Sequence, residues 1–186
     1  MVSMSGEAEL PCLLSDKWIQ GLTFEAFVAF SRKNVERMRE NYERTVVPDA
    51  LAAEVEALDR DARLLVIGAD WCGDVVANVP SIARLADLNE KRLQLRILDR
   101  DRHDDLMRRF LTDGTRSIPI VIIGPPNFAR HGHWGPRPAE CQRIMTENKE
   151  KLPKEQIVPL IRDWYGKDAF QSVLQEVWAV IKAQTG

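Results

Sequence analysis

The chain has 186 residues, and its 26 Lys and Arg against 28 Asp and Glu leave a net charge of −2. This balance argues against a nucleic-acid partner, because phosphate-binding surfaces concentrate Lys and Arg. No apolar run approaches the roughly 18 residues that cross a bilayer, and the N-terminal segment lacks the basic and apolar regions of a secretory signal. These features predict one soluble domain with no nucleic-acid or membrane partner.

The cysteines indicate a reducing compartment. Cys12, Cys72 and Cys141 are far apart in the sequence and form no C-x-x-C pair. An odd number of cysteines without paired spacing is typical of free thiols. We therefore expect a cytoplasmic protein.

The N-terminal part predicts one long helix after an irregular start. Residues 1–20 show no clear period and are expected to be irregular, with residues 18–19 packed onto the domain. Thr23 is of a residue type that caps helices, and the apolar residues from 24 to 42 recur every three or four positions. The opposite face, residues 32–40, carries mixed charges that we interpret as a solvated stripe.

A second helix and the first strand follow. Pro48 and Asp49 break the long helix and start another over residues 50–58, which predicts a helical hairpin. Residues 64–67 are an apolar run with the length of a buried strand, and Gly68 ends it.

Cys72 lies where this strand passes into a helix, because residues 75–88 carry helical apolar spacing. A cysteine at such a turn meets the free N–H groups of the first helical turn and the positive end of the helix dipole. Both favour the thiolate, which is the nucleophile. Packing alone does not require a cysteine there.

Three further strands are expected. Residues 93–98 alternate apolar and polar side chains and predict a parallel strand. A charged turn and a short helix ending at Gly114 come next. Residues 118–123 predict a buried strand begun by Pro119, and residues 128–134 predict a short antiparallel edge strand.

The remaining chain is expected to be helical. Pro136 lies in the first turn of a helix whose apolar face carries Cys141, which favours core packing over a chemical role for this thiol. Pro153 and Pro159 are expected to interrupt the next stretch, and the last helix is predicted over residues 168–182.

Two segments resemble the thioredoxin superfamily. Trp71-Cys72-Gly73, with Pro80 eight residues after the cysteine, resembles the W-C-G-P-C motif and its helix proline. Arg116-Ser117-Ile118-Pro119 resembles the thioredoxin segment in which a cis-proline faces the active cysteine. Cys72 and Pro119 are 47 positions apart, which is close to thioredoxin spacing.

The resemblance covers residues 60–135 and implies an α/β fold, a thioredoxin-like sandwich with a mixed sheet and helices on both faces. Residues 22–59 would be an N-terminal helical extension and residues 136–186 C-terminal helices of the same single domain, 1–186. Within the superfamily, the chain resembles bacterial proteins that carry W-C-G-D and one cysteine.

The chain departs from the dithiol pattern. Val75 occupies the place of the second cysteine, Asp74 that of the motif proline, and Val66 that of the buried acid. We therefore expect a thiol–disulfide oxidoreductase with a monothiol mechanism through Cys72. The mixed disulfide would be resolved by glutathione, another small thiol or the substrate's own second thiol.

The expected partners are protein or small-molecule thiols and disulfides, with no cofactor beyond such a co-substrate. His131 and His133 are too few for a zinc site, so no metal is expected.

Two other classes of function stay open. A redox-inactive binding or scaffold protein would keep the fold and the proline platform, and the loss of the second cysteine and the buried acid favours it. A peroxide-reacting thiol is disfavoured, because Ala69 stands where the T-x-x-C pattern of peroxiredoxins has threonine.

Opposing charges are expected to act on the pKa of Cys72. Asp70 and Asp74 place negative charge near the sulfur and raise this pKa, while the helix N-terminus lowers it. Asp74 has an alternative role as a helix cap, in which its charge would lie on the backbone N–H groups.

By resemblance, Ile118 and Pro119 would hold a cysteine-containing peptide in register over Cys72. Trp71 and Gly73 would shape the site. Two further hypotheses concern the surroundings of Cys72. Trp134 and Arg137 would line a substrate groove in which Arg137 binds a carboxylate, and Arg116 would supply positive charge near the thiolate.

Overall fold

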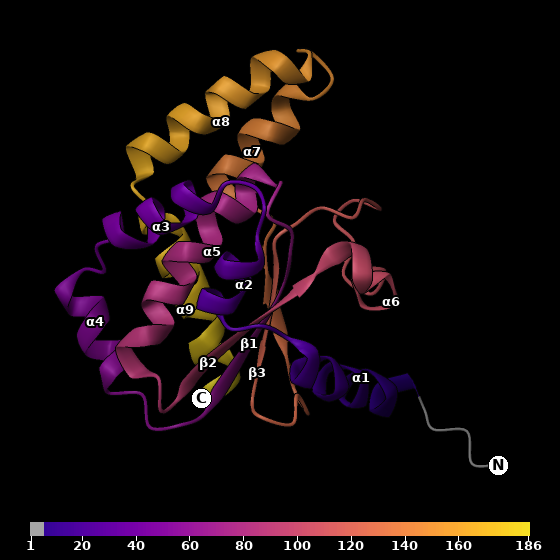
Figure 1. Cartoon of the computed structure of the whole chain (residues 1–186), viewed down its shortest axis with the longest axis vertical. Helices are drawn as coiled ribbons and strands as arrows, with labels where there is room; N and C mark the ends of the chain where they lie inside the picture. Colours follow the sequence, from indigo (N-terminus) through magenta and orange to yellow (C-terminus); the bar gives the residue numbers. More distant parts are fainter. Residues whose placement is uncertain (1–5) are drawn as a thin grey trace.

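The structure is a computed structural model that describes residues 6–186 (Figure 1). Its centre is a four-stranded sheet in the order β2-β1-β3-β4. β1 and β2 are parallel, and β3 is antiparallel to both β1 and β4. The strands span Ala62–Gly68 (β1), Leu93–Asp99 (β2), Ile120–Gly124 (β3) and Gly132–Trp134 (β4).

The two central strands are buried on both faces, which is why their sequences are continuous apolar runs. Every residue of β3 is buried, and in β1 only Arg63 is partly exposed. The sequence predicted these strands, the parallel pairing of β2 and the antiparallel edge strand. β3 begins at Ile120, just after Pro119, and β4 is shorter than the predicted segment 128–134.

Helices cover both faces of the sheet. Figure 1 shows α5 (Gly73–Ala86) and α9 (Gln171–Thr185) on one side and α1 (Gly6–Gln20) with α6 (Asp104–Met107) on the other. This is the thioredoxin-like α/β arrangement that the sequence predicted. Two 3-10 turns, Asp87–Asn89 and Arg100–Arg102, follow α5 and β2.

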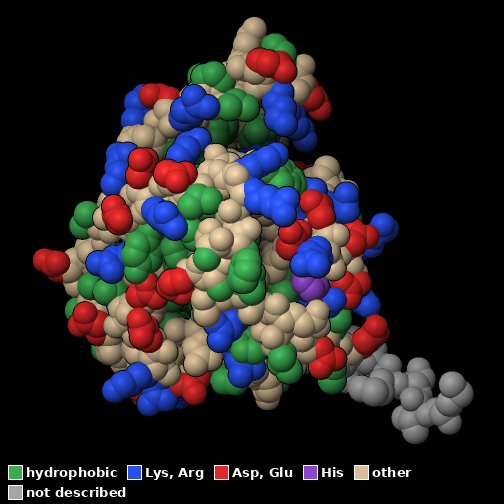
Figure 2. Space-filling view, in the orientation of Figure 1, with side chains coloured by type: hydrophobic (Ala, Val, Ile, Leu, Met, Phe, Trp, Pro, Cys, Tyr) green, Lys and Arg blue, Asp and Glu red, His purple; other side chains and the backbone are tan. Residues whose placement is uncertain are grey.

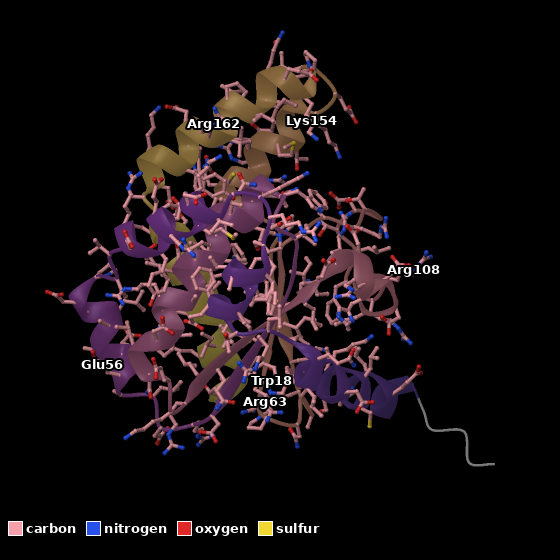
Figure 3. The ribbon with its side chains drawn as sticks, in the orientation of Figure 1. Trp18, Glu56, Arg63, Arg108, Lys154 and Arg162 are labelled. Carbon is pink, nitrogen blue, oxygen red and sulfur yellow. The ribbon has the colours of Figure 1, made fainter. Side chains whose placement is uncertain are left out.

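The prediction that residues 1–20 are irregular is wrong for the described residues, since α1 runs from Gly6 to Gln20. Leu10, Leu14 and Trp18 are four residues apart and pack against the main core. The Arg63 guanidinium lies 4.8 Å from the centre of the Trp18 ring (Figure 3). Ile19 does not pack onto the domain, because it is 82% exposed.

The predicted long helix is two helices, α2 (Phe24–Phe30) and α3 (Val35–Arg44). Thr23 caps α2 as expected, because its hydroxyl accepts a hydrogen bond from the Ala26 N–H at 3.2 Å. Between the helices, Asn34 adopts a left-handed conformation with φ 56°. The predicted second helix is α4, Asp49–Glu56.

The C-terminal helices form a hairpin and a sheet-covering helix. α7 (Ala139–Asn148) and α8 (Lys154–Asp168) contact each other and form a hairpin at one end of the molecule (Figure 1). Cys141, Ile157 and Ile161 are buried in a small core of their own. Pro153 precedes α8 as expected, but Pro159 lies inside it rather than interrupting it.

Within residues 6–186, no helix combines the length and the apolar content that a membrane crossing requires.

Replacing Leu14 with Ala tests whether α1 belongs to the core. Leu14 is completely buried, so Leu14→Ala is expected to lower the free energy of unfolding by about 2–5 kcal/mol. Ile19→Ala on the same helix is the control and is expected to change it by less than about 0.5 kcal/mol. Urea unfolding followed by circular dichroism measures both. Equal effects of the two variants would contradict the packing of α1.

Candidate active site around Cys72

Cys72 begins the helix that follows the first strand. After β1 ends, the Cys72 N–H donates to the Ala69 carbonyl at 3.1 Å and closes a turn. Cys72 is the N-cap of α5, and its own carbonyl accepts the Val76 N–H at 3.0 Å. The thiol therefore lies at the positive end of the helix, where the sequence predicted it.

The thiol contacts the segment before β3. Cys72 Sγ donates a hydrogen bond to the Ile118 carbonyl oxygen at 3.4 Å. The Ile118–Pro119 peptide bond is cis. Ile118 is only 4% exposed, and Cys72 is partly exposed. The structure thus brings together the two segments on which the resemblance rests.

Burial is the main influence on the pKa of Cys72 and raises it above the usual value. The backbone N–H groups of Val75 and Asp74 lower this pKa, as a helix N-terminus should. The negative charge of Asp74 raises it, and the positive charge of Arg137 lowers it. The net result is a raised pKa, so the helix N-terminus does not outweigh burial and Asp74.

Asp74 binds one side chain from the segment before α7 and one from α8, and it does not cap α5. Its Oδ2 lies 2.6 Å from an Arg137 Nη, and both side chains are largely buried. Its Oδ1 accepts the Tyr165 hydroxyl at 3.1 Å. Burial raises the pKa of Asp74, whereas the charge and hydrogen bonds of Arg137 lower it. One carboxylate therefore joins α5 to the start of α7 and to α8.

Asn78, one turn after Asp74 in α5, extends this network. Asn78 is completely buried, and its amide nitrogen donates to the Tyr165 hydroxyl at 2.7 Å and to the Asp74 carbonyl at 2.9 Å. The Arg137 Nη1 donates to Gln142 Oε1 at 3.0 Å. Sequence periodicity did not reveal Asn78 or Tyr165, because each looks like an ordinary helical residue until α8 is placed beside α5.

Asp70 has a different role from the one expected. Its Oδ2 accepts the backbone N–H groups of Arg32 at 2.7 Å and Lys33 at 3.0 Å. The Asn34 side-chain amide donates to the Asp70 carbonyl at 2.8 Å. Asp70 thus joins the turn between α2 and α3 to the loop before Cys72, and the charges that act on the thiol are those of Asp74 and Arg137.

Two of the predicted substrate-binding residues point elsewhere. Trp134 is buried, and its Nε1 donates to Glu176 Oε2 at 2.7 Å. Arg116 pairs with Asp104 at 2.6 Å on the exposed surface. Gly135, which follows Trp134, packs closely on Pro119, because a Cβ at Gly135 would lie 2.1 Å from the Pro119 carbonyl oxygen.

The other predicted residues lie close to the thiol. Trp71, Gly73, Asp74 and Arg137 line the same pocket as Cys72. Trp71 is 44% exposed, and the Arg100 guanidinium lies 4.6 Å from the centre of its ring.

The pocket beside Cys72 has a volume of about 580 Å³. Its walls come from α3, the first turn of α5 and the α7–α8 hairpin, so two segments outside the predicted core, 60–135, build most of it. Four cations that sequence reasoning did not select also line it: Arg37, Arg44, Lys154 and Arg162.

The other two cysteines differ from Cys72. Cys141 is buried as predicted, and burial raises its pKa to about 12. Cys12 is exposed on α1, across the sheet from α5 (Figure 1). Within the described part of the chain, no three His, Cys, Asp or Glu side chains gather as a metal site.

The fold agrees with solved structures over nearly its whole length. A Pseudomonas aeruginosa protein of unknown function is 23% identical, with a TM-score of 0.69 over 98% of this chain and 99% of that one. An HIV epitope scaffold is 25% identical, with a TM-score of 0.67 over 91% and 97% of the two chains. None of the curated proteins compared with the chain matches it. The family model described as thioredoxin matches residues 21–151, more than half of the chain, and the protein therefore belongs to the thioredoxin family.

Proposed function

We propose that the protein is a thiol–disulfide oxidoreductase of the cytoplasm that works through one cysteine, Cys72. The observation that carries this proposal is the position of the thiol. It lies at the start of α5, against the Ile118 carbonyl, and it borders a pocket large enough for a small molecule. The unpaired state of all three cysteines agrees with a reducing compartment.

The reaction needs only one protein sulfur. The Cys72 thiolate attacks a disulfide R–S–S–R, so that a Cys72–S–S–R bond forms, the original S–S bond breaks and RS⁻ leaves with the electron pair. A second thiolate, R′S⁻, then attacks the R sulfur. This forms R–S–S–R′ and returns the Cys72 thiolate.

The second thiol comes from outside the chain in this mechanism. Val75 fills the place of a local second cysteine. Cys141 is buried with its pKa raised to about 12, which makes it a poor attacking thiol at neutral pH. Cys12 is on the opposite side of the sheet (Figure 1). A low-molecular-weight thiol or a second thiol of the substrate completes the cycle.

The raised pKa of Cys72 affects the two steps of the exchange differently. A basic thiol is a poor leaving group, so the attack of R′S⁻ that releases Cys72 is expected to be the slower of the two steps. A cysteine whose thiolate is not stabilised also favours its disulfide-bonded state, the opposite of a strong oxidant such as DsbA. We therefore propose that Cys72 reduces its partner and that the mixed disulfide accumulates during turnover.

The same pKa supports a second candidate function, a binding protein without redox turnover. In such a protein Cys72 would line the pocket as a protonated thiol and would not react. Stable binding of a small molecule without a mixed disulfide would favour this alternative over the oxidoreductase.

The pH dependence of Cys72 alkylation tests the electrostatics of the site, on a Cys12→Ser/Cys141→Ala background. The midpoint is expected above the free-cysteine value of about 8.5. Asp74→Asn removes the negative charge that raises the pKa of Cys72 and is expected to shift the midpoint down. Initial labelling rates with iodoacetamide at a series of pH values give both midpoints.

Asp70→Asn is the matched control for this experiment. Its amide oxygen can still accept the N–H groups of Arg32 and Lys33, so the midpoint is expected to stay where it is in the parent. A downward shift in the Asp70 variant, or none in the Asp74 variant, would contradict the assignment of charges at Cys72.

Turnover with a disulfide tests the reaction itself. With excess reduced thiol, the parent protein is expected to accelerate exchange of a small disulfide, and intact mass spectrometry should show one added thiol on Cys72. Cys72→Ser should abolish both effects, whereas Cys12→Ser/Cys141→Ala should keep them. Activity that persists in Cys72→Ser, or a parent that forms no adduct, would exclude the monothiol mechanism.

A further inference from the structure

The pocket beside Cys72 carries excess positive charge. Arg37 and Arg44 enter its lining from α3, and Lys154 and Arg162 from α8. Figure 3 labels the two α8 residues along that helix. Figure 2 shows Lys and Arg side chains where the α7–α8 hairpin meets the rest of the molecule, with hydrophobic atoms between them.

These four cations have no ion-pair partner among residues 9–186, whose side chains the structure describes. The one carboxylate in the lining is Asp74, and it is already paired with Arg137 at 2.6 Å. The charge is therefore not neutralised locally. Cations gathered around a concave surface attract anions and concentrate them there.

The rest of the lining is largely apolar. It includes Trp71, Met145, Val158, Ile161 and Phe170. A ligand that fits this surface combines negative charge with apolar or aliphatic groups. An inorganic anion would leave the apolar part of the pocket in contact with water, which is unfavourable.

The shape favours a small molecule over a protein strand. The volume of about 580 Å³ falls in the range of small-molecule sites. An extended peptide would need to pair with the backbone at Ile118, but Ile118 is 4% exposed and its carbonyl already accepts the Cys72 thiol. Neither Ile118 nor Pro119 lines the pocket.

We propose that this pocket selects low-molecular-weight disulfides whose organic arms carry carboxylates, and that it presents their sulfur atoms to Cys72. This rests on the proposed disulfide exchange at Cys72. The carboxylates are held by the cations of α3 and α8, and the apolar side chains contact the carbon chain.

Alkylation by two reagents of similar size tests the charge selection without any disulfide. Iodoacetate is an anion and iodoacetamide is neutral, so the ratio of their rates at Cys72 reports the local potential. On the Cys12→Ser/Cys141→Ala background and at low salt, this ratio is expected to exceed that of N-acetylcysteine about tenfold. It should fall toward the free-thiol ratio as salt is added.

Matched variants locate the effect. Arg37→Gln/Arg162→Gln removes one pocket cation from α3 and one from α8 and is expected to reduce the ratio severalfold. Arg39→Gln/Lys167→Gln removes the same charge from the same helices outside the pocket and should leave the ratio unchanged. A parent ratio equal to that of the free thiol, or equal losses in the two double variants, would overturn the charge selection.

Three disulfides then test the substrate class: anionic 3,3′-dithiodipropionate, neutral 2-hydroxyethyl disulfide and cationic cystamine. The expected order of mixed-disulfide formation is anionic, then neutral, then cationic, with about tenfold between the extremes at low salt. Equal rates would overturn the selection while leaving the oxidoreductase intact. If none of the three disulfides forms a mixed disulfide while the alkylation ratio stays raised, the oxidoreductase and the disulfide substrate are both refuted. The pocket would then be a site for small carboxylates.

Discussion

The ion pair between Asp74 and Arg137 holds the candidate site together. It joins the first turn of the helix that begins at Cys72 to the segment before α7, and the Tyr165 hydroxyl adds α8 to the same carboxylate. Loss of one partner from a buried pair costs about 3–5 kcal/mol, because the remaining charge stays buried. The proline of the W-C-G-P-C motif has no side-chain group to accept these bonds. Asp74 at this position therefore attaches the C-terminal hairpin to the active-site helix.

This attachment has opposite effects on the pocket and on the thiol. The hairpin supplies one wall of the pocket that Cys72 borders. Burial is the largest cause of the raised pKa of this thiol. Asp74 adds to that rise through its charge, while Arg137, which it holds in place, partly offsets it. Asp74 thus anchors a wall of the pocket and at the same time disfavours the thiolate beside it.

Local patterns predicted the elements whose structure depends on local chemistry. Residues 64–67 form a strand whose apolar side chains are all buried, and residues 93–98 form a strand that alternates partly, as its sequence does. Thr23 caps a helix with its own hydroxyl. The break between α2 and α3 was not predictable in this way. It depends on Asp70, which accepts N–H groups 37 and 38 residues earlier in the chain and so competes with helix continuation. Tertiary hydrogen bonds overrode a helical pattern that was otherwise correct.

The candidate site also combines parts that local patterns predict with parts that depend on tertiary packing. The meeting of Cys72 with Ile118 could be predicted, because both lie in motifs of the thioredoxin core. The cations could not. Arg37 belongs to a stripe with the pattern of an ordinary solvated face, and Arg162 is 125 positions further along the chain. Only the packing of the added helices places both in one pocket. The core thus supplies the thiol and the segment that contacts it, while the added helices supply the charge that we propose selects the substrate. Relatives with the same core but different added helices are therefore expected to share the chemistry of Cys72 and to differ in the molecules that reach it.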